Sequence, residues 1–156
     1  MKVLCVLLCI WLIACNSAPV AYISADKNFR EHYGILYLDG KPFSGNQFML
    51  FENGDTSFVY RYSDGKKTGE HRAWWPNGKL KFIYHYDKDI FEGSVQEWYE
   101  DGRLYRSMNY AEGHEKGLQQ IRLPDGTLYA NYEVRNGRNY GMTGTRHCKN
   151  YWKDER

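Results

Sequence analysis

The sequence predicts an all-β protein: an extended, twisted antiparallel meander of about four β-hairpins, with partial units at both ends. Nine glycines form two ladders with a step of 24 residues, at 45, 69, 93, 117 and 141 and at 54, 78, 102 and 126. Each glycine of the second ladder follows an Asn or Asp between two short alternating runs. No run after residue 15 has sustained helical spacing. A fixed period of this size indicates stacked copies of one supersecondary unit.

Residues 1–14 are predicted to be a secretory signal peptide. A single lysine precedes an apolar stretch over residues 3–13, which is too short to span a membrane. The stretch ends in Leu12-Ile13-Ala14-Cys15, which resembles the lipobox of bacterial lipoproteins. The resemblance implies cleavage before Cys15 and makes this cysteine the lipid attachment site. An ordinary signal peptide and an uncleaved anchor are the alternatives.

Residues 15–32 are predicted to be the lipid-attached N-terminus and a tether, because they show no clear periodicity. Several acyl chains together anchor a protein stably, whereas a single chain is marginal. An Asp directly after the lipidated cysteine resembles the inner-membrane retention signal of enteric bacteria. This chain has Asn at position 16 and therefore lacks that signal. The address therefore favours the outer membrane of a bacterial envelope, on its periplasmic or surface side.

Residues 33–141 are predicted to form the repeat sheet, and residues 142–156 a C-terminal cap or tail. In the clearest unit, Asn77-Gly78 joins two alternating runs. A type I′ turn needs positive φ at both central residues, which Asn-Gly tolerates. The predicted structural turn glycines are Gly54, Gly78, Gly102 and Gly126.

A second turn closes each unit, and most copies carry a glycine there. These turns are Asp39-Gly40, Asp64-Gly65, Glu112-Gly113 and Asn136-Gly137. One unit has Asp89 where the glycine is expected, so that turn is predicted to be less regular.

A two-residue turn determines the expected register and therefore the two faces of the sheet. The expected pairs are Trp75 with Leu80, Ala73 with Phe82, His71 with Tyr84, Glu97 with Arg106 and Ile121 with Ala130. These residues are mostly apolar, and we call their side of the sheet the core face. The other side, the outer face, is polar with isolated large groups. Glu97 and Arg106 would form an opposite-charge cross-strand pair.

Large side chains on the outer face are the one feature with binding character. The candidate binding patch consists of Trp74, Trp98, Lys81, Tyr105, Arg122 and Tyr129. Rigid amphipathic rings beside cations are typical of recognition surfaces. The alternative is that these residues shield their own sheet.

Composition excludes several function classes. The formal net charge is +2, and Lys and Arg are spread among acids, so we expect no nucleic-acid partner. The five histidines show no metal-ligand spacing, and no glycine-rich phosphate loop occurs, so we expect no metal and no cofactor. Aromatic residues are 17% of the chain, which suits a thin sheet that must bury area efficiently.

Two residues leave an enzymatic alternative open. His85 is expected opposite Glu70 on the outer face, as a base with an orienting carboxylate or, more simply, as a surface pair. Cys148 is the only cysteine left after lipidation and cleavage, so an internal disulfide is excluded. Cys148 is then a small tail residue without a chemical role, forms a disulfide with a partner protein, or carries a reactive thiol.

The repeating unit resembles the MORN-repeat variant, and especially the YwqK-type proteins often labelled antitoxin components. The resemblance covers roughly residues 34–141. It rests on Gly69, Trp74, Trp75, Asn77, Gly78, Leu80 and Tyr86, and on their counterparts 24 residues later. It implies a twisted antiparallel sheet used for protein or membrane contact, with no conserved active site.

We therefore expect a lipid-anchored, non-enzymatic envelope protein with an unidentified protein partner, attached to the membrane through its acyl chains. One alternative is an antitoxin-like partner that neutralises a toxin, although an antitoxin normally acts in the cytoplasm. The other is an enzyme that uses His85 or Cys148. The sequence does not specify the oligomeric state.

Overall fold

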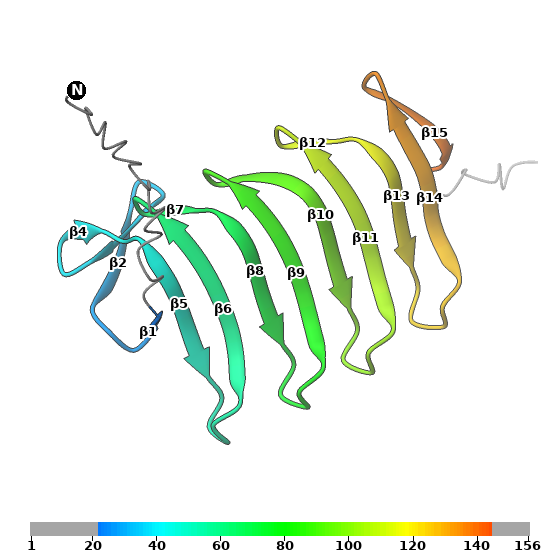
Figure 1. Ribbon diagram of the computed structural model, residues 1–156. Coiled ribbons are helices and arrows are strands. Elements are labelled where there is room, and N and C mark those ends of the chain that lie inside the picture. Colours follow the sequence, from blue (N-terminus) through cyan, green and yellow to red (C-terminus); the bar gives the residue numbers. More distant parts are fainter. Residues whose placement is uncertain (1–21, 145–156) are drawn as a thin grey trace, which may run out of the picture.

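The computed structural model describes residues 22–144, which form an open, twisted β-structure without a second covering layer along most of its length (Figure 1). The all-β prediction is confirmed. No helix occurs among these residues, and so none of them forms a helix able to cross a membrane. The signal peptide, Cys15 and Cys148 lie outside the described residues.

The first seven strands are β1 (Tyr22–Ser24), β2 (Phe29–His32), β3 (Ile35–Leu38), β4 (Lys41–Pro42), β5 (Gly45–Leu50), β6 (Thr56–Ser63) and β7 (Lys66–Lys67). The remaining eight are β8 (Gly69–Trp74), β9 (Leu80–Asp87), β10 (Ile90–Trp98), β11 (Leu104–Ala111), β12 (His114–Glu115), β13 (Gly117–Arg122), β14 (Leu128–Arg135) and β15 (Arg138–Met142).

Twelve strands form the main sheet, in the order β1-β5-β6-β8-β9-β10-β11-β13-β14-β15, with β7 beside β6 and β12 beside β11. The hairpins follow one another across the sheet, as the 24-residue period predicts (Figure 1). All neighbours are antiparallel except β1, which pairs parallel to β5. Strands β1 and β2 lie within the segment 15–32, so its last part is ordered structure and not tether.

A small sheet of β2, β3 and β4 covers the first-hairpin end of the main sheet. Leu36 of β3 donates its main-chain N–H to the carbonyl of Gly65, 2.9 Å away, in a closing turn of the main sheet. Phe43 is only 4% exposed, and its ring lies between those of Phe29 and Tyr62. The predicted repeat sheet of residues 33–141 includes β3 and β4, but these strands belong to this separate sheet, so the main repeat begins later than predicted. The sequence gives no sign of a second sheet, because these strands have no long alternating run.

The turns at Gly54, Gly78, Gly102 and Gly126 are not type I′. In the clearest unit Gly78 has φ 80, whereas Asn77 does not have positive φ. Gly78 donates its N–H to the carbonyl of Trp75 at 2.9 Å, and Trp75 donates to the carbonyl of Lys79 at 2.8 Å. This is a three-residue loop, a type I turn followed by a left-handed glycine. Pro76 stands at the second turn position, where proline is favoured.

The longer loop shifts the register beside each of these turns. Trp74, and not Trp75, pairs with Leu80, and an irregularity separates this pair from Ala73 and Phe82. The same shift recurs between Leu50 and Thr56, Trp98 and Leu104, and Arg122 and Leu128. The other expected pairs are confirmed, namely Ala73 with Phe82, His71 with Tyr84, Glu97 with Arg106 and Ile121 with Ala130.

True two-residue turns with positive φ at both positions occur at the opposite ends of the hairpins. Asp64 and Gly65 have φ 49 and 77, between paired Ser63 and Lys66. The turn with Asp89 is equally regular, with φ 48 at Lys88 and 71 at Asp89, so the expectation of irregularity there is wrong. Asp tolerates the left-handed region better than most residues because its short side chain bonds locally.

The core face is buried by placing small residues among large ones. Ala130 is fully buried and forms a cluster with Tyr132, Val134 and the half-buried Ile121. Val95 is 1% exposed in the middle of the sheet. Many of the large side chains on this face are only half-buried, because no second layer packs against them.

Candidate functional site

The core face carries a continuous row of aromatic rings. We define the aromatic row as Phe29, Phe43, Phe58, Tyr60, Tyr62, His71, Phe82, Tyr84, Tyr86, Phe91 and Tyr110. Each ring centroid lies within 6.1 Å of another in the row. Alternation along β6 and β9 places three of these rings from each strand on one face. The row begins under the small sheet and continues onto the open sheet.

The middle of the row is a set of nearly parallel rings. Phe58 and Tyr60 stack at 4.2 Å with planes 15° apart, and Phe82 and Tyr84 stack at 4.1 Å and 12°. Tyr60 and Phe82 connect the two pairs at 6.1 Å. These four side chains are only half-buried. Rings spaced two residues apart on one strand stabilise the sheet, yet they leave apolar surface exposed.

His71 is the buried polar member of the row. It is 2% exposed and stacks on Tyr60 at 4.9 Å. Its Nε2 lies 2.7 Å from the carbonyl oxygen of Arg61, and because a carbonyl only accepts, Nε2 carries the proton. Burial lowers the pKa of His71 to about 4. The ring is therefore neutral near pH 7 and serves the packing of the row.

A charged cluster stands at the end of the stacked rings. Glu97 accepts hydrogen bonds at Oε1 from the Tyr84 hydroxyl and from Nη2 of Arg106. The side chains of Glu97 and Arg106 are 16% and 34% exposed. Nε of Arg106 is buried and has no hydrogen-bond partner among residues 22–144. Burial, followed by the bond to Glu97, raises the pKa of Tyr84, so this hydroxyl keeps its proton and donates it.

The outer face brings Ser94, His85 and Glu70 together, which is the composition of a hydrolytic triad. Nδ1 of His85 lies 2.9 Å from the Ser94 carbonyl oxygen and 3.4 Å from its hydroxyl, and Nε2 lies 3.6 Å from Glu70. The carbonyl requires Nδ1 to carry a proton, so Nδ1 cannot accept one from the serine. Glu70 also binds Nε of Arg72 at 2.5 Å. This arrangement fits a surface polar network better than an activated nucleophile.

The predicted binding patch is distributed along successive hairpins, near their three-residue turns. Lys81 lies over the ring of Trp75, with 4.5 Å from Nζ to the centroid, and the Tyr105 ring lies 5.1 Å from that of Tyr99. Trp75 and Tyr99 therefore accompany outer-face residues, and the prediction that Trp75 lies on the core face is wrong. The register shift beside each turn is the cause.

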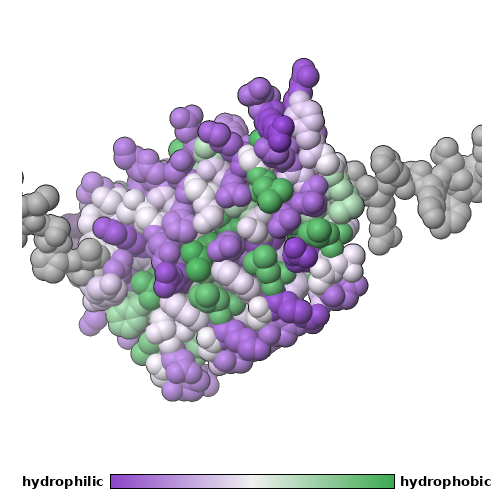
Figure 2. All heavy atoms as spheres, turned by 45° about the vertical axis from the view of Figure 1, so that its right-hand side comes forward, coloured by the Kyte–Doolittle hydropathy of each residue, from purple (hydrophilic) through white to green (hydrophobic). Residues whose placement is uncertain are grey.

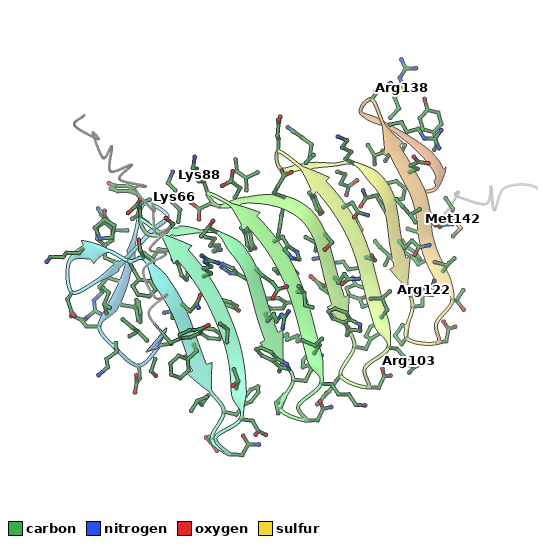
Figure 3. The ribbon with its side chains drawn as sticks, viewed as in Figure 1. Lys66, Lys88, Arg103, Arg122, Arg138 and Met142 are labelled. Carbon is green, nitrogen blue, oxygen red and sulfur yellow. The ribbon has the colours of Figure 1, made fainter. Side chains whose placement is uncertain are left out.

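The two tryptophans of the patch pair with the core-face residues Leu80 and Leu104, so their predicted place on the outer face is wrong. Trp74 and Trp98 are both half-buried, and no ring contact joins them within residues 22–144. Arg122 donates to the carbonyl of Gly126 at 3.3 Å, within its own turn. Tyr129 is 41% exposed and lies against Gly144. Figure 3 shows Arg103 and Arg122 beside the lower turns, on neighbouring hairpins. The patch is a series of separate positions and not one cluster.

Sequence reasoning missed the side-chain bonds that join one hairpin to the next. Trp75 donates its indole N–H to the carbonyl of Trp98 at 3.1 Å, and the Tyr99 hydroxyl donates to the carbonyl of Arg122 at 2.7 Å. Asn77 donates to the carbonyl of Glu100 at 2.7 Å. The 24-residue recurrence of Trp and Tyr before the turn was the signal, because both carry a donor on a long ring.

A cleft of about 310 Å³ lies where the small sheet meets the closing turns. Its lining mixes signs and includes Lys66, Lys67, Glu31 and Asp89. Burial first, and then neighbouring Tyr60, raises the pKa of the lining residue Tyr62 to about 12. Within residues 22–144, no three metal-ligating side chains converge. The cleft does not show a preference for one ligand charge.

Comparison of the chain with protein-family models, with curated proteins and with solved structures finds no match.

Proposed function

We propose that this protein is a lipid-anchored, non-enzymatic component of a bacterial envelope, and that its open MORN-like sheet binds a protein partner. The half-exposed middle of the aromatic row is the observation that carries the proposal. Four stacked rings there, from β6 and β9, are apolar and only half-buried. Exposed apolar surface of this kind is typical of interaction sites.

The row has the composition of a protein-binding surface. Aromatic side chains and arginine are enriched at the centres of interfaces, and here Arg106 follows the rings directly. Glu97 holds the guanidinium in one orientation, so a partner would meet a preorganised group. In the space-filling view, hydrophobic residues are interspersed with hydrophilic ones over the face shown (Figure 2).

The predicted outer-face patch is the competing location on the same sheet. Its rings are engaged along the sheet: Trp75 and Tyr99 bond to carbonyls of the next hairpin, and Lys81 covers Trp75. These contacts favour the interpretation that outer-face rings shield the sheet. The core-face row is therefore our preferred site.

Photo-crosslinking in intact cells distinguishes the two locations. A photoreactive residue replaces Phe82 in the row, Ile83 on the other face of the same strand, or Tyr105 in the outer-face patch. We expect one discrete protein adduct from position 82, and none from position 83. Adducts from position 105 alone would move the site to the outer face. The absence of any discrete adduct at all three positions would overturn the binding proposal.

A further inference from the structure

The main sheet ends in an open edge at β15. This strand pairs with β14 on one side, and within residues 22–144 no strand pairs with its other side. All five of its residues are exposed. Figure 3 shows Arg138 and Met142 at that edge. Proteins normally protect such an edge because its free backbone groups recruit other strands.

The register of β15 differs from that of the three preceding units. Near the closing turn Tyr110 pairs with Glu115, and farther along the same strand Ser107 pairs with Gln120. Between these two pairs β11 advances by three residues and the chain that pairs with it by five, so that chain contains two extra residues. The same offset of two separates the closing turn from the next strand at β6–β8 and β9–β10.

Between β14 and β15 this offset is absent, since Arg135 pairs with Arg138 and Asn131 with Met142. The glycines at the interior offsets have φ from 62 to 87, whereas Gly141 has φ 120. The interior offset moves the chain over to begin the next hairpin. Without it, β15 continues straight along β14 as a terminal strand.

Two residues of β15 direct their backbone groups outward. The two-residue turn makes Arg135 and Arg138 a hydrogen-bonded pair, and bonded and non-bonded pairs alternate along an antiparallel ladder. Asn139 and Gly141 therefore occupy non-bonded positions toward β14. Their N–H and C=O groups face the open edge.

Apolar side chains accompany this edge on the outer face. Tyr140 is 54% exposed and Met142 is 50% exposed. Tyr140 pairs with Glu133, which pairs with Leu118 on the next strand, also 50% exposed. An open backbone beside exposed apolar side chains is the combination that strand addition buries.

We infer that β15 pairs antiparallel with β15 of a second copy of this chain, in the register that places Asn139 opposite Gly141 of that copy. This register uses the outward groups of both residues on each strand. It also places the two Tyr140 side chains directly opposite, as a cross-strand aromatic pair. The inference concerns the sheet edge and does not depend on the partner proposed for the aromatic row.

The edge is complementary to itself in charge and shape. Arg138 falls opposite Met142 of the second copy, so no like charges face each other. Asn139 falls opposite a glycine, which leaves room for its side chain. The other end of the sheet is different in kind, because β1 has three residues and pairs parallel. A twofold contact at β15 closes on itself, whereas joining β15 to β1 would give open polymers.

The pairing is of a kind that depends on local concentration. One five-residue strand from each copy makes an interface smaller than the usual stable size. Confinement of both copies to one membrane raises their effective concentration and favours the pair. The dimer is therefore best tested in the membrane, on the full chain.

Disulfide trapping tests the proposed register of the β15–β15 pair directly. In a Cys148→Ser background, Tyr140→Cys places two thiols opposite each other, at a separation that a disulfide spans. Mild oxidation of membranes should convert most of this variant to a covalent dimer. Arg138→Cys alone should not crosslink, because residue 138 lies opposite residue 142 of the second copy, about four residues along the strand from that copy's residue 138. Arg138→Cys with Met142→Cys should crosslink.

Two controls complete the experiment. Leu50→Cys introduces an equally exposed thiol, 49% exposed at another site, and should remain monomeric, as should the background alone. Asn139→Pro added to Tyr140→Cys removes an outward N–H without removing a bond to β14, and should abolish trapping. Trapping at 138 alone would overturn the register. No trapping at 140 in any condition would overturn the dimer, including the case in which residues 145–156 cover the edge.

Discussion

Trp75 donates its indole N–H to the main-chain carbonyl of Trp98, across the strand that lies between them. The Tyr99 hydroxyl makes the same connection to Arg122 one unit later. Backbone pairing between these hairpins ends before the turns, at Glu97 with Phe82 between β10 and β9 and at Arg106 with Ile121 between β11 and β13. These ring-to-carbonyl bonds continue the connection toward the turns, where the backbone ladder has ended.

Tyr99→Phe should lower the free energy of unfolding by about 1 kcal/mol, because the ring stays and only the bond to the Arg122 carbonyl is lost. Urea denaturation gives the difference. Tyr105→Phe is the matched control, since no hydrogen bond of its hydroxyl is found within residues 22–144. Equal effects of the two variants would contradict the role of the bond.

Gly78→Ala isolates backbone strain. A Cβ there would meet no atom within 4 Å, and φ is 80, so the variant should lose about 1–2 kcal/mol through conformation alone. Gly78→Asn should lose less, because Asn tolerates this region. Thermal unfolding at several urea concentrations checks both, and an Asn variant less stable than the Ala variant would argue against the turn geometry.

Gly65→Ala should be more harmful than Gly78→Ala. A Cβ at Gly65 would lie 2.4 Å from Cγ2 of Ile35 and 2.7 Å from the carbonyl of Leu36, where the small sheet meets the main sheet. Gly113 is also constrained, because a Cβ there would lie 2.9 Å from Cγ2 of Ile90. Limited proteolysis of Gly65→Ala should show the small sheet released first. Release of the C-terminal hairpins instead would contradict this assignment.

His71 should make stability depend on pH. Its pKa is lowered to about 4 by burial, while in the unfolded chain it is near 6.5. Between these values the unfolded chain binds the extra proton, so acidification favours unfolding. The free energy of unfolding should fall as pH drops from about 7 to 4, by up to about 1.4 kcal/mol per pH unit. The contribution of neutral His71 to stability is fully present above the pKa of the unfolded chain, near 6.5.

His71→Gln should flatten that part of the pH profile, although it also lowers stability at every pH. The relevant measurement is the slope between pH 7 and 5, where few carboxylates titrate. A variant with the wild-type slope would exclude His71 as the titrating group.

Glu97→Gln should destabilise the chain by roughly 1–2 kcal/mol, because Arg106 loses its charge partner in a partly buried place. A double-mutant cycle with Tyr84→Phe should show coupling, since both remove bonds to the same carboxylate. Additive losses would mean that the Tyr84 hydroxyl does not contribute through Glu97.

Cys15→Ser should leave the precursor uncut or release the protein from membranes, because the predicted lipid attachment is lost. Labelling with a fatty-acid analogue, followed by fractionation, gives the result. The Cys148→Ser variant is the control and should incorporate label normally. Absence of label in the wild-type protein would contradict the lipoprotein prediction.

The repeating part of the fold was predictable because its signals are local. Turn residues every 24 positions, with alternating runs between them, were sufficient for the hairpins and for pairs such as Ala73 with Phe82. The turn type was not read correctly. Asn-Gly suits both a two-residue and a three-residue loop, and Pro76 was the residue that favoured the second.

The other features that the sequence did not predict depend on contacts between residues far apart in the chain. The parallel pairing of β1 with β5 and the small sheet over Tyr62 depend on contacts between segments without repeat spacing. Alternation predicts that the aromatic row is core, but the row is half-exposed, because alternation identifies a face and does not tell whether anything covers it. His71 was assigned to the correct face, yet its near-complete burial follows only from the rings around it.

The early start of β1 limits how far the sheet can travel from a bilayer. If Cys15 carries the acyl chains, seven Cα–Cα steps reach Tyr22, an extended length of at most about 25 Å. The sheet from β1 to β15 measures about 40 Å across its strands. The segment between Cys15 and Tyr22 is thus shorter than the sheet is wide. With that anchor, the β1 end would stay near the headgroups, while the β15 end would move over a wider arc and would set the distance within which it contacts neighbouring molecules.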